Sequence, residues 1–304
     1  MITTPLRSRW VLALTLLLFV GFTVGCDSSD DEPTQNIVEL AADTPSLSTL
    51  VAAVNAAGLG NALSAEDPIT VFAPIDAAFA EIDGTVDALL EADNSALLTK
   101  VLQYHVVAGR FEAADLEGRT TLTTLAGQTL RINTEGGVTI NNATVQTANI
   151  EASNGIVHLI DGVLLESLDV VERAIVTPDL STLVTAVTAG QLVGTLQDAD
   201  NITLFAPTND AFGRVDPATL TSLLEPANRG QLQNILSFHV APQLLFAADL
   251  MPGAQVGTLL ANNPLTVTLN DNGAFVNDIR IIATDIEVSN GVVHLIENVL
   301  LPPS

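Results

Sequence analysis

The chain has 304 residues, of which 48% are hydrophobic, and its 10 Lys and Arg face 35 Asp and Glu, a formal net charge of −25. Nucleic acids and anionic lipid surfaces are bound by basic residues that neutralise phosphate charge, so this composition argues against both as partners. With a single cysteine no intrachain disulfide can form, and each domain must be stabilised by packing.

Residues 1–25 have the pattern of a signal peptide, in which two arginines precede an apolar run from Trp10 to Val24. A membrane-spanning helix needs about 20 apolar residues, so this run fits the core of a signal peptide better. Cys26 follows, and the segment resembles the lipobox of bacterial lipoprotein precursors, although Thr23 stands where that motif usually has Leu. We therefore expect Cys26 to be lipidated; the alternative is ordinary signal cleavage beside a stray cysteine.

Residues 26–36 are polar and acidic and lack an apolar face, so we expect a disordered tether. Removal of residues 1–25 leaves eight basic residues against 35 acidic ones, a net charge of −27. Lys100 is the only lysine. This acidic surface indicates either adaptation to high salt, which screens the repulsion, or a bias in genome composition.

The remaining chain falls into two halves that open with the same amphipathic helical pattern. Apolar residues recur at helical spacing over 47–54 and again over 180–187, with Ser46 and Asp179 as the expected N-caps.

A short buried strand follows in each half, over 69–73 and 202–206, and a proline ends each strand. Asp76 and Asn209 are then placed to cap a further helical turn.

A longer helical stretch comes next, over 94–104 in the first half and 228–238 in the second. These stretches lead into Tyr104-His105 and Phe238-His239, respectively.

The hydrophobic period then changes from helical to alternating. Residues 129–133 and 138–140 alternate around the glycine-containing segment 135–137, and residues 265–269 alternate before Asn-Asp-Asn-Gly at 270–273. Such segments predict β-hairpins.

The last strands of the two halves, 156–160 and 292–296, are apolar except for His158 and His294, so we expect them to be central in a sheet. Helices followed by a run of strands predict an α+β fold.

The two halves are copies of one unit. Residues 70–79 return at 203–212, offset by 133 residues, and residues 153–160 return at 289–296, offset by 136. A period of this length is a whole domain, since solenoid repeats run about 20 to 50 residues. We therefore predict two domains, at 37–168 and 169–304, that are docked through a short, stiff joint without Pro or Gly.

These repeated motifs, Thr-Val-Phe-Ala-Pro, Tyr-His and Ser-Asn-Gly-Ile-Val-His-Leu-Ile-Asp, resemble those of the fasciclin (FAS1) domain, and the resemblance covers both halves. It implies a wedge-like β-sandwich flanked by helices, found in secreted and membrane-anchored proteins of cell adhesion, and no catalytic activity. In that family the Tyr-His motif is linked with adhesion. It corresponds here to Tyr104-His105 and to Phe238-His239, where the hydroxyl is lost.

All four histidines lie within the repeated motifs, yet each stands alone in an apolar run without a second His or Cys at ligand spacing. We interpret them as buried structural residues, above all His158 and His294, and expect no metal and no cofactor. The acidic spacing of a calcium loop is missing at 270–273. None of the short catalytic or nucleotide-binding motifs occurs, so we expect no enzyme.

The sequence thus predicts an exported, lipid-anchored envelope protein that adheres through non-covalent contact with extracellular matrix, a glycan or a cell-surface protein. Lipid would attach it to the membrane at its N-terminus. One alternative is a module that assembles envelope proteins. A small-molecule carrier, which the sequence favours least, would need an enclosed polar pocket.

Overall fold

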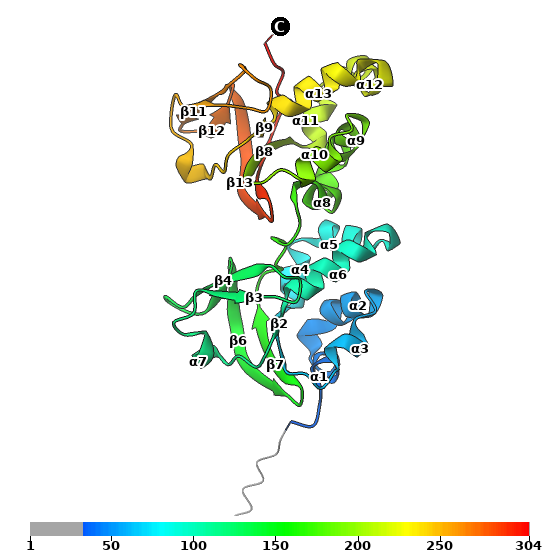
Figure 1. Cartoon of the computed structure of the whole chain (residues 1–304), viewed down its shortest axis with the longest axis vertical. Coiled ribbons are helices and arrows are strands. Elements are labelled where there is room, and N and C mark those ends of the chain that lie inside the picture. The colour runs from blue at the N-terminus through cyan, green and yellow to red at the C-terminus, as the bar shows by residue number, and fades with distance from the viewer. Residues whose placement is uncertain (1–32, 304) are drawn as a thin grey trace, which may run out of the picture. The chain divides into compact units, whose positions relative to one another are not determined.

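The computed structural model of the chain describes residues 33–303. The expected signal peptide at 1–25, the lipidation site Cys26 and most of the tether at 26–36 lie outside the described residues. From residue 37 onward the chain forms two α+β units whose elements follow one another in the same order (Figure 1).

The first unit begins with helices and ends with strands, as the change of hydrophobic period predicts. Its helical elements are α1 (Ile37–Asp43), η1 (Pro45–Leu47), α2 (Ser48–Ala56), α3 (Gly60–Leu63), α4 (Asp76–Ala80), α5 (Asp83–Leu90), η2 (Ala92–Asn94), α6 (Ser95–Tyr104) and α7 (Ala113–Leu116). Its strands are β1 (Ile69–Pro74), β2 (Val106–Ala108), β3 (Thr121–Thr123), β4 (Thr129–Asn133), β5 (Thr139–Ile140), β6 (Ala143–Ala152) and β7 (Gly155–Ile160).

The seven strands are hydrogen-bonded in the order β2-β1-β7-β6-β5-β4-β3. Strand β7 runs parallel to β1, with His158 opposite Phe72, and antiparallel to β6 on its other side. All six residues of β7 are buried. The prediction of a central final strand is therefore confirmed.

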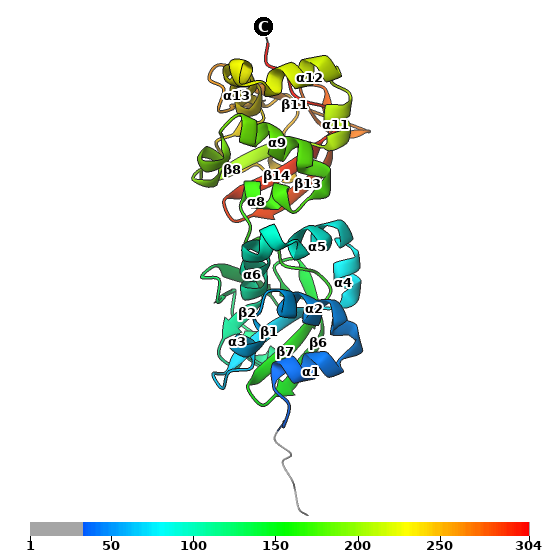
Figure 2. The same ribbon diagram turned by 90° about the vertical axis from the view of Figure 1, so that its right-hand side faces the viewer.

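Hydrophobic side chains pack on both faces of the central strands, because successive residues of a strand point to opposite sides. Val71 of β1 packs in a cluster with Leu102 of α6, whereas the adjacent Phe72 packs in another cluster with Leu130 of β4 and Ile140 of β5. Strands β3 to β5 thus form a second layer over β1 and β7. On the opposite face, helices α1 and α2 cover the same strands (Figure 2).

The second unit repeats this design. Its helical elements are α8 (Val170–Ile175), η3 (Pro178–Leu180), α9 (Ser181–Ala189), α10 (Val193–Gln197), α11 (Asn209–Gly213), α12 (Pro217–Leu224), η4 (Pro226–Asn228), α13 (Arg229–Phe238) and η5 (Ala247–Asp249). Its strands are β8 (Ile202–Pro207), β9 (Val240–Ala241), β10 (Gln255–Val256), β11 (Leu265–Asn270), β12 (Gly273–Val276), β13 (Ile279–Val288) and β14 (Gly291–Ile296). The sheet order β9-β8-β14-β13-β12-β11-β10 is that of the first unit.

Both predicted hairpins are present. Strands β4 and β5 pair antiparallel, and β11 pairs with β12 so that Asn270 stands opposite Gly273. The second hairpin therefore turns through Asp271 and Asn272, as the Asn- and Gly-rich segment predicts.

The starts of helices α2 and α9 differ from the prediction. Ser46 and Asp179, the expected N-caps, lie inside the 3-10 turns η1 and η3, and neither α2 nor α9 has a side-chain cap from its own N-cap residue. A proline at the first position of each 3-10 turn fixes the backbone there, and the regular helix begins only after that turn.

The two residues expected to cap a helical turn after the first strand instead serve α2 and α9. Asp76 Oδ1 accepts a hydrogen bond from the Thr49 amide at 2.8 Å, and Asn209 Oδ1 accepts one from the Thr182 amide at 2.9 Å. Each cap is thus supplied from a helix that follows in sequence and packs against the helix it caps.

Within residues 33–303, no single helix is both long and apolar enough to cross a membrane. Helix α1 and the following stretch Pro45–Ala56 are long and apolar enough only when taken together, and the pair is bent by 107°.

Candidate functional site

His158 and His294 lie in the middle of the central strands β7 and β14, and both are fully buried. The Nε2 atom of His158 lies 2.8 Å from the Phe111 carbonyl oxygen, and its Nδ1 lies 3.4 Å from the Asn149 amide nitrogen. Because a carbonyl only accepts and an amide only donates, Nε2 carries the proton and the ring is neutral. Burial lowers the pKa of His158, and the backbone hydrogen bond only partly opposes this.

His294 has the same environment in the second unit. Its Nε2 lies 2.8 Å from the Leu245 carbonyl and its Nδ1 lies 3.3 Å from the Asp285 amide. The ring also stacks on Phe205 at 5.5 Å, as His158 stacks on Phe72 at the same separation. Each of these histidines holds a loop carbonyl and a neighbouring strand to the central strand, which is the geometry that a structural role requires.

The Tyr-His motif ends helix α6, and its histidine links that helix to the last segment of the first unit. The Nδ1 atom of His105 lies 2.8 Å from the Val101 carbonyl, and Nε2 accepts from the Leu164 amide at 3.0 Å. In the second unit His239 bonds the Ile235 carbonyl and the Leu300 amide in the same way. Burial lowers the pKa of both imidazoles to about 4.

The side chains of both copies of this motif are buried, with exposed fractions of 3% for Tyr104 and His105, 0% for Phe238 and 1% for His239. None of them offers a contact surface as it stands. The Tyr104 hydroxyl donates to the Thr129 carbonyl at 3.1 Å and accepts from Asn141 Nδ2 at 3.0 Å. A role of the motif in adhesion stays a prediction, and it would have to act through the surface that these residues support.

The Ser-Asn-Gly motif joins the central strand to the helices. Asn154 Oδ1 accepts from the Ile37 amide at 2.9 Å, and Nδ2 donates to the carbonyls of Leu63 and Ala65 at 2.8 and 2.9 Å. Asn290 makes the equivalent three bonds in the second unit. A single amide thus fixes the start of one helix and the end of another.

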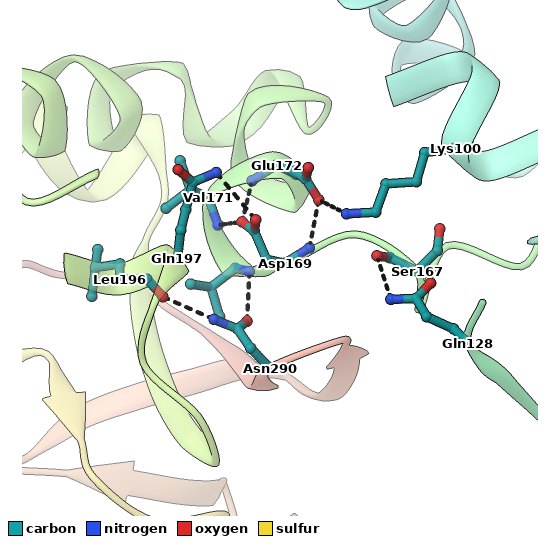
Figure 3. A network of polar contacts seen from close by, with 10 residues as sticks. Lys100, Gln128, Ser167, Asp169, Val171, Glu172, Leu196, Gln197 and Asn290 are labelled. Carbon is teal, nitrogen blue, oxygen red and sulfur yellow. Dashed lines mark hydrogen bonds and ion pairs between the residues drawn. The ribbon is translucent and has the colours of Figure 1, made fainter. Parts of the chain in front are cut away.

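The joint between the units contacts both of them (Figure 3). Lys100 of α6 forms an ion pair of 2.6 Å with Glu172 of α8, and Gln128 Nε2 donates to the Ser167 carbonyl at 3.1 Å. Asp169 begins α8 with a capping box in which Glu172 takes part. These contacts join the two units at the joint, and its stiffness stays a prediction.

Residues 33–303 contain no group of three or more His, Cys, Asp or Glu side chains that could hold a metal ion. Cys26, the one cysteine, lies outside the described residues.

The described units are thus a tandem repeat of one α+β domain. Residues 45–166 and 178–302 both match the family model described as "Fasciclin domain". The chain belongs to the fasciclin domain family.

Its relatives include bacterial and animal proteins. "Protein sll1483" of Synechocystis sp. is 50% identical over 131 residues, which are 42% of this chain and 72% of that protein. "Transforming growth factor-beta-induced protein ig-h3" of Oryctolagus cuniculus is 30% identical over 277 residues, which are 89% of this chain and 38% of that longer protein. A solved FAS1 domain pair from the insect cell adhesion molecule fasciclin I matches with a TM-score of 0.43 and 19% identity, over 82% of this chain and 92% of its own.

Sequence reasoning did not single out Asn154 and Asn290, although the repetition of Ser-Asn-Gly marked their position. It also missed Arg131, whose guanidinium pairs with Glu287 of the second unit at 2.7 Å. No local pattern could reveal this pair, because 156 positions separate its members.

Proposed function

We propose that this protein is a non-enzymatic adhesion protein that binds extracellular matrix, a glycan or a cell-surface protein. We further propose that it is exported to a bacterial envelope and attached to the membrane by lipid at Cys26. The observation that carries the proposal is that nearly the whole chain after the tether consists of two fasciclin domains. The signal-peptide pattern of residues 1–25 and the similarity to a Synechocystis protein support export in a bacterium.

The chemistry of the repeated motifs also supports a binding role. Each of the four histidines has both ring nitrogens within 3.4 Å of a backbone partner, so none has a lone pair or proton free for a substrate. General acid–base catalysis requires such a free group. The motifs that define the family therefore hold the fold together, and recognition is left to the surfaces of the units.

An array of glycans and matrix proteins, probed with the intact chain at low and at high salt, tests this proposal. We expect retention on at least one polysaccharide or matrix protein. Failure to bind any of them, combined with stoichiometric capture of a protein from the organism's own membrane extract, would replace adhesion by envelope assembly.

A further inference from the structure

A polar cavity of about 280 Å³ lies where the joint meets both units. Its walls include Tyr104, Gln128, Arg131, Glu166 and Glu287. Four other cavities, inside the helical cores, are lined mainly by apolar side chains and hold only about 20 to 80 Å³. The polar cavity is close to the lower end, about 300 Å³, of the pockets that bind small molecules.

Several polar groups in the wall of this cavity already have partners. Arg131 is paired with Glu287, and the Tyr104 hydroxyl is held between Thr129 and Asn141. Burial raises the pKa of Tyr104 to about 12, so the hydroxyl keeps its proton. These groups are therefore held in place by protein partners and form fixed parts of the cavity wall.

Two other oxygen atoms in the wall lack a partner within residues 33–303. Gln128 Oε1 and Glu166 Oε2 are both buried and accept no hydrogen bond. A buried acceptor without a hydrogen bond destabilises the protein, and more so if it is charged. Both side chains line the cavity, and rotation of each toward it would offer its acceptor to a ligand that supplies donors.

The charges around the cavity narrow the class of ligand. Two carboxylates, of Glu166 and Glu287, face the single guanidinium of Arg131, so an anion would be repelled. The same guanidinium disfavours a metal ion or an ammonium group. A neutral molecule with several hydroxyl groups satisfies all of these conditions.

Comparison of the two copies shows that the fold does not require these side chains. Asn141 Oδ1 accepts from the amide of Arg131, and Asn277 Oδ1 accepts in the same way from Thr266, so Thr266 is the counterpart of Arg131. Phe238 likewise replaces Tyr104.

Glu166 is also absent from the second copy. It lies two residues after Leu164, which bonds His105, and Pro302 lies two residues after Leu300, which bonds His239. The backbone arrangement is thus repeated while the polar wall is specific to the first copy.

We propose that this cavity binds a neutral polyhydroxyl group, such as one sugar ring, whose hydroxyls donate to Gln128 Oε1 and the Glu166 carboxylate. The inference rests on the proposed adhesion function and gives it a specific site.

Ligand-observed NMR on the full chain tests the proposal, with glucose, galactose, mannose and N-acetylglucosamine as probes. We expect at least one of them to bind, and Glu166→Ala to weaken its affinity at least about tenfold by removing an acceptor. The melting temperature of Glu166→Ala should be unchanged or higher, because the variant no longer buries an unsatisfied carboxylate. If Glu166 only stabilised the fold, its replacement by Ala would instead lower the melting temperature.

Asn263→Ala, which truncates a polar side chain at the counterpart of Gln128 in the second unit, is the control and should bind as the unaltered chain does. The inference is overturned if none of the four sugars binds, or if Glu166→Ala binds them normally. Retention of the unaltered chain on the glycan and matrix array, measured in parallel, shows in either case whether the adhesion function survives the loss of this site.

Discussion

His105 and His239 each close a link between the end of a helix and the last segment of a unit, and both must be neutral to do so. The pKa of each is about 4 in the folded protein and ordinarily 6.5. As pH falls below 6.5, these two imidazoles become protonated in the unfolded chain but stay neutral in the folded protein. The stabilisation is complete above pH 6.5 and is lost progressively toward pH 4.

The free energy of unfolding should therefore decrease on acidification. Between pH 7 and pH 5 we expect a loss of about 2 kcal/mol for each of these two histidines. Denaturant titrations followed by circular dichroism measure it. His105→Gln should be less stable at pH 7 but should show a smaller decrease toward pH 5. An identical decrease in the variant and the unaltered chain would contradict the assignment.

Asn290 shows how one amide can serve three backbone groups, and its replacement by Asp tests that role. The Oδ1 atom is an acceptor in both residues, but Asp has no Nδ2 to donate to the Leu196 and Ala199 carbonyls. We expect Asn290→Asp to lower the free energy of unfolding by about 2–4 kcal/mol. Asn272→Asp, at the exposed hairpin turn, is the control and should change it by less than about 0.5 kcal/mol.

At the level of elements, the sequence predicted what depends on short-range patterns and missed what depends on distant contacts. The central strands followed from apolar runs, and the hairpins followed from alternation around glycine. The capping of α2 by Asp76 could not be predicted, because the carboxylate acts on an amide 27 positions earlier. The same holds for the bonds of Asn154 to Ile37 and Leu63, which are 117 and 91 positions away.

Parallel pairing of β14 with β8 requires a residue without a side chain at Gly291. A Cβ atom there would lie 2.1 Å from the Ile202 carbonyl oxygen, a backbone atom that cannot move without breaking the strand pair. We expect Gly291→Ala to destabilise the second unit by several kcal/mol, on the order of a large core substitution.

Gly194→Ala provides the control for this prediction, because a Cβ on that residue of α10 would have no neighbour within 4 Å. Alanine also favours a helix by up to about 1 kcal/mol relative to glycine. The melting temperature of the two variants should therefore move in opposite directions. Equal changes of the melting temperature in the two variants would argue against close packing at the Ser-Asn-Gly motif.

On the scale of the whole molecule, the dominant feature is a net charge of −25, which opposes compaction. Salt shortens the range of this repulsion to about 3 Å at 1 M. We expect the melting temperature to rise by on the order of 5 °C between 0.05 and 1 M NaCl. KCl should act equally if screening is the cause. A constant or falling melting temperature would contradict an acidic surface adapted to salt.

The candidate site was the part least accessible to sequence reasoning. The sequence placed the Tyr-His motif at the end of a helix, but the burial of Tyr104 depends on its packing against β4 and β5. The polar cavity brings together residues as distant as Tyr104 and Glu287, which no periodicity connects. The differences between the two copies, such as Phe238 in place of Tyr104, were the only indication in the sequence that polar side chains of the first copy are replaced in the second.

The most direct measurement of the central claim is the attachment of cells that export either the intact protein or a form that keeps residues 1–36 but lacks 37–304. Surfaces coated with the array's best-retaining polysaccharide or matrix protein provide the substrate. We predict that cells with the truncated form attach substantially less than cells with the intact protein, at equal surface expression of the tether. Attachment that is unchanged by loss of both fasciclin domains would contradict it.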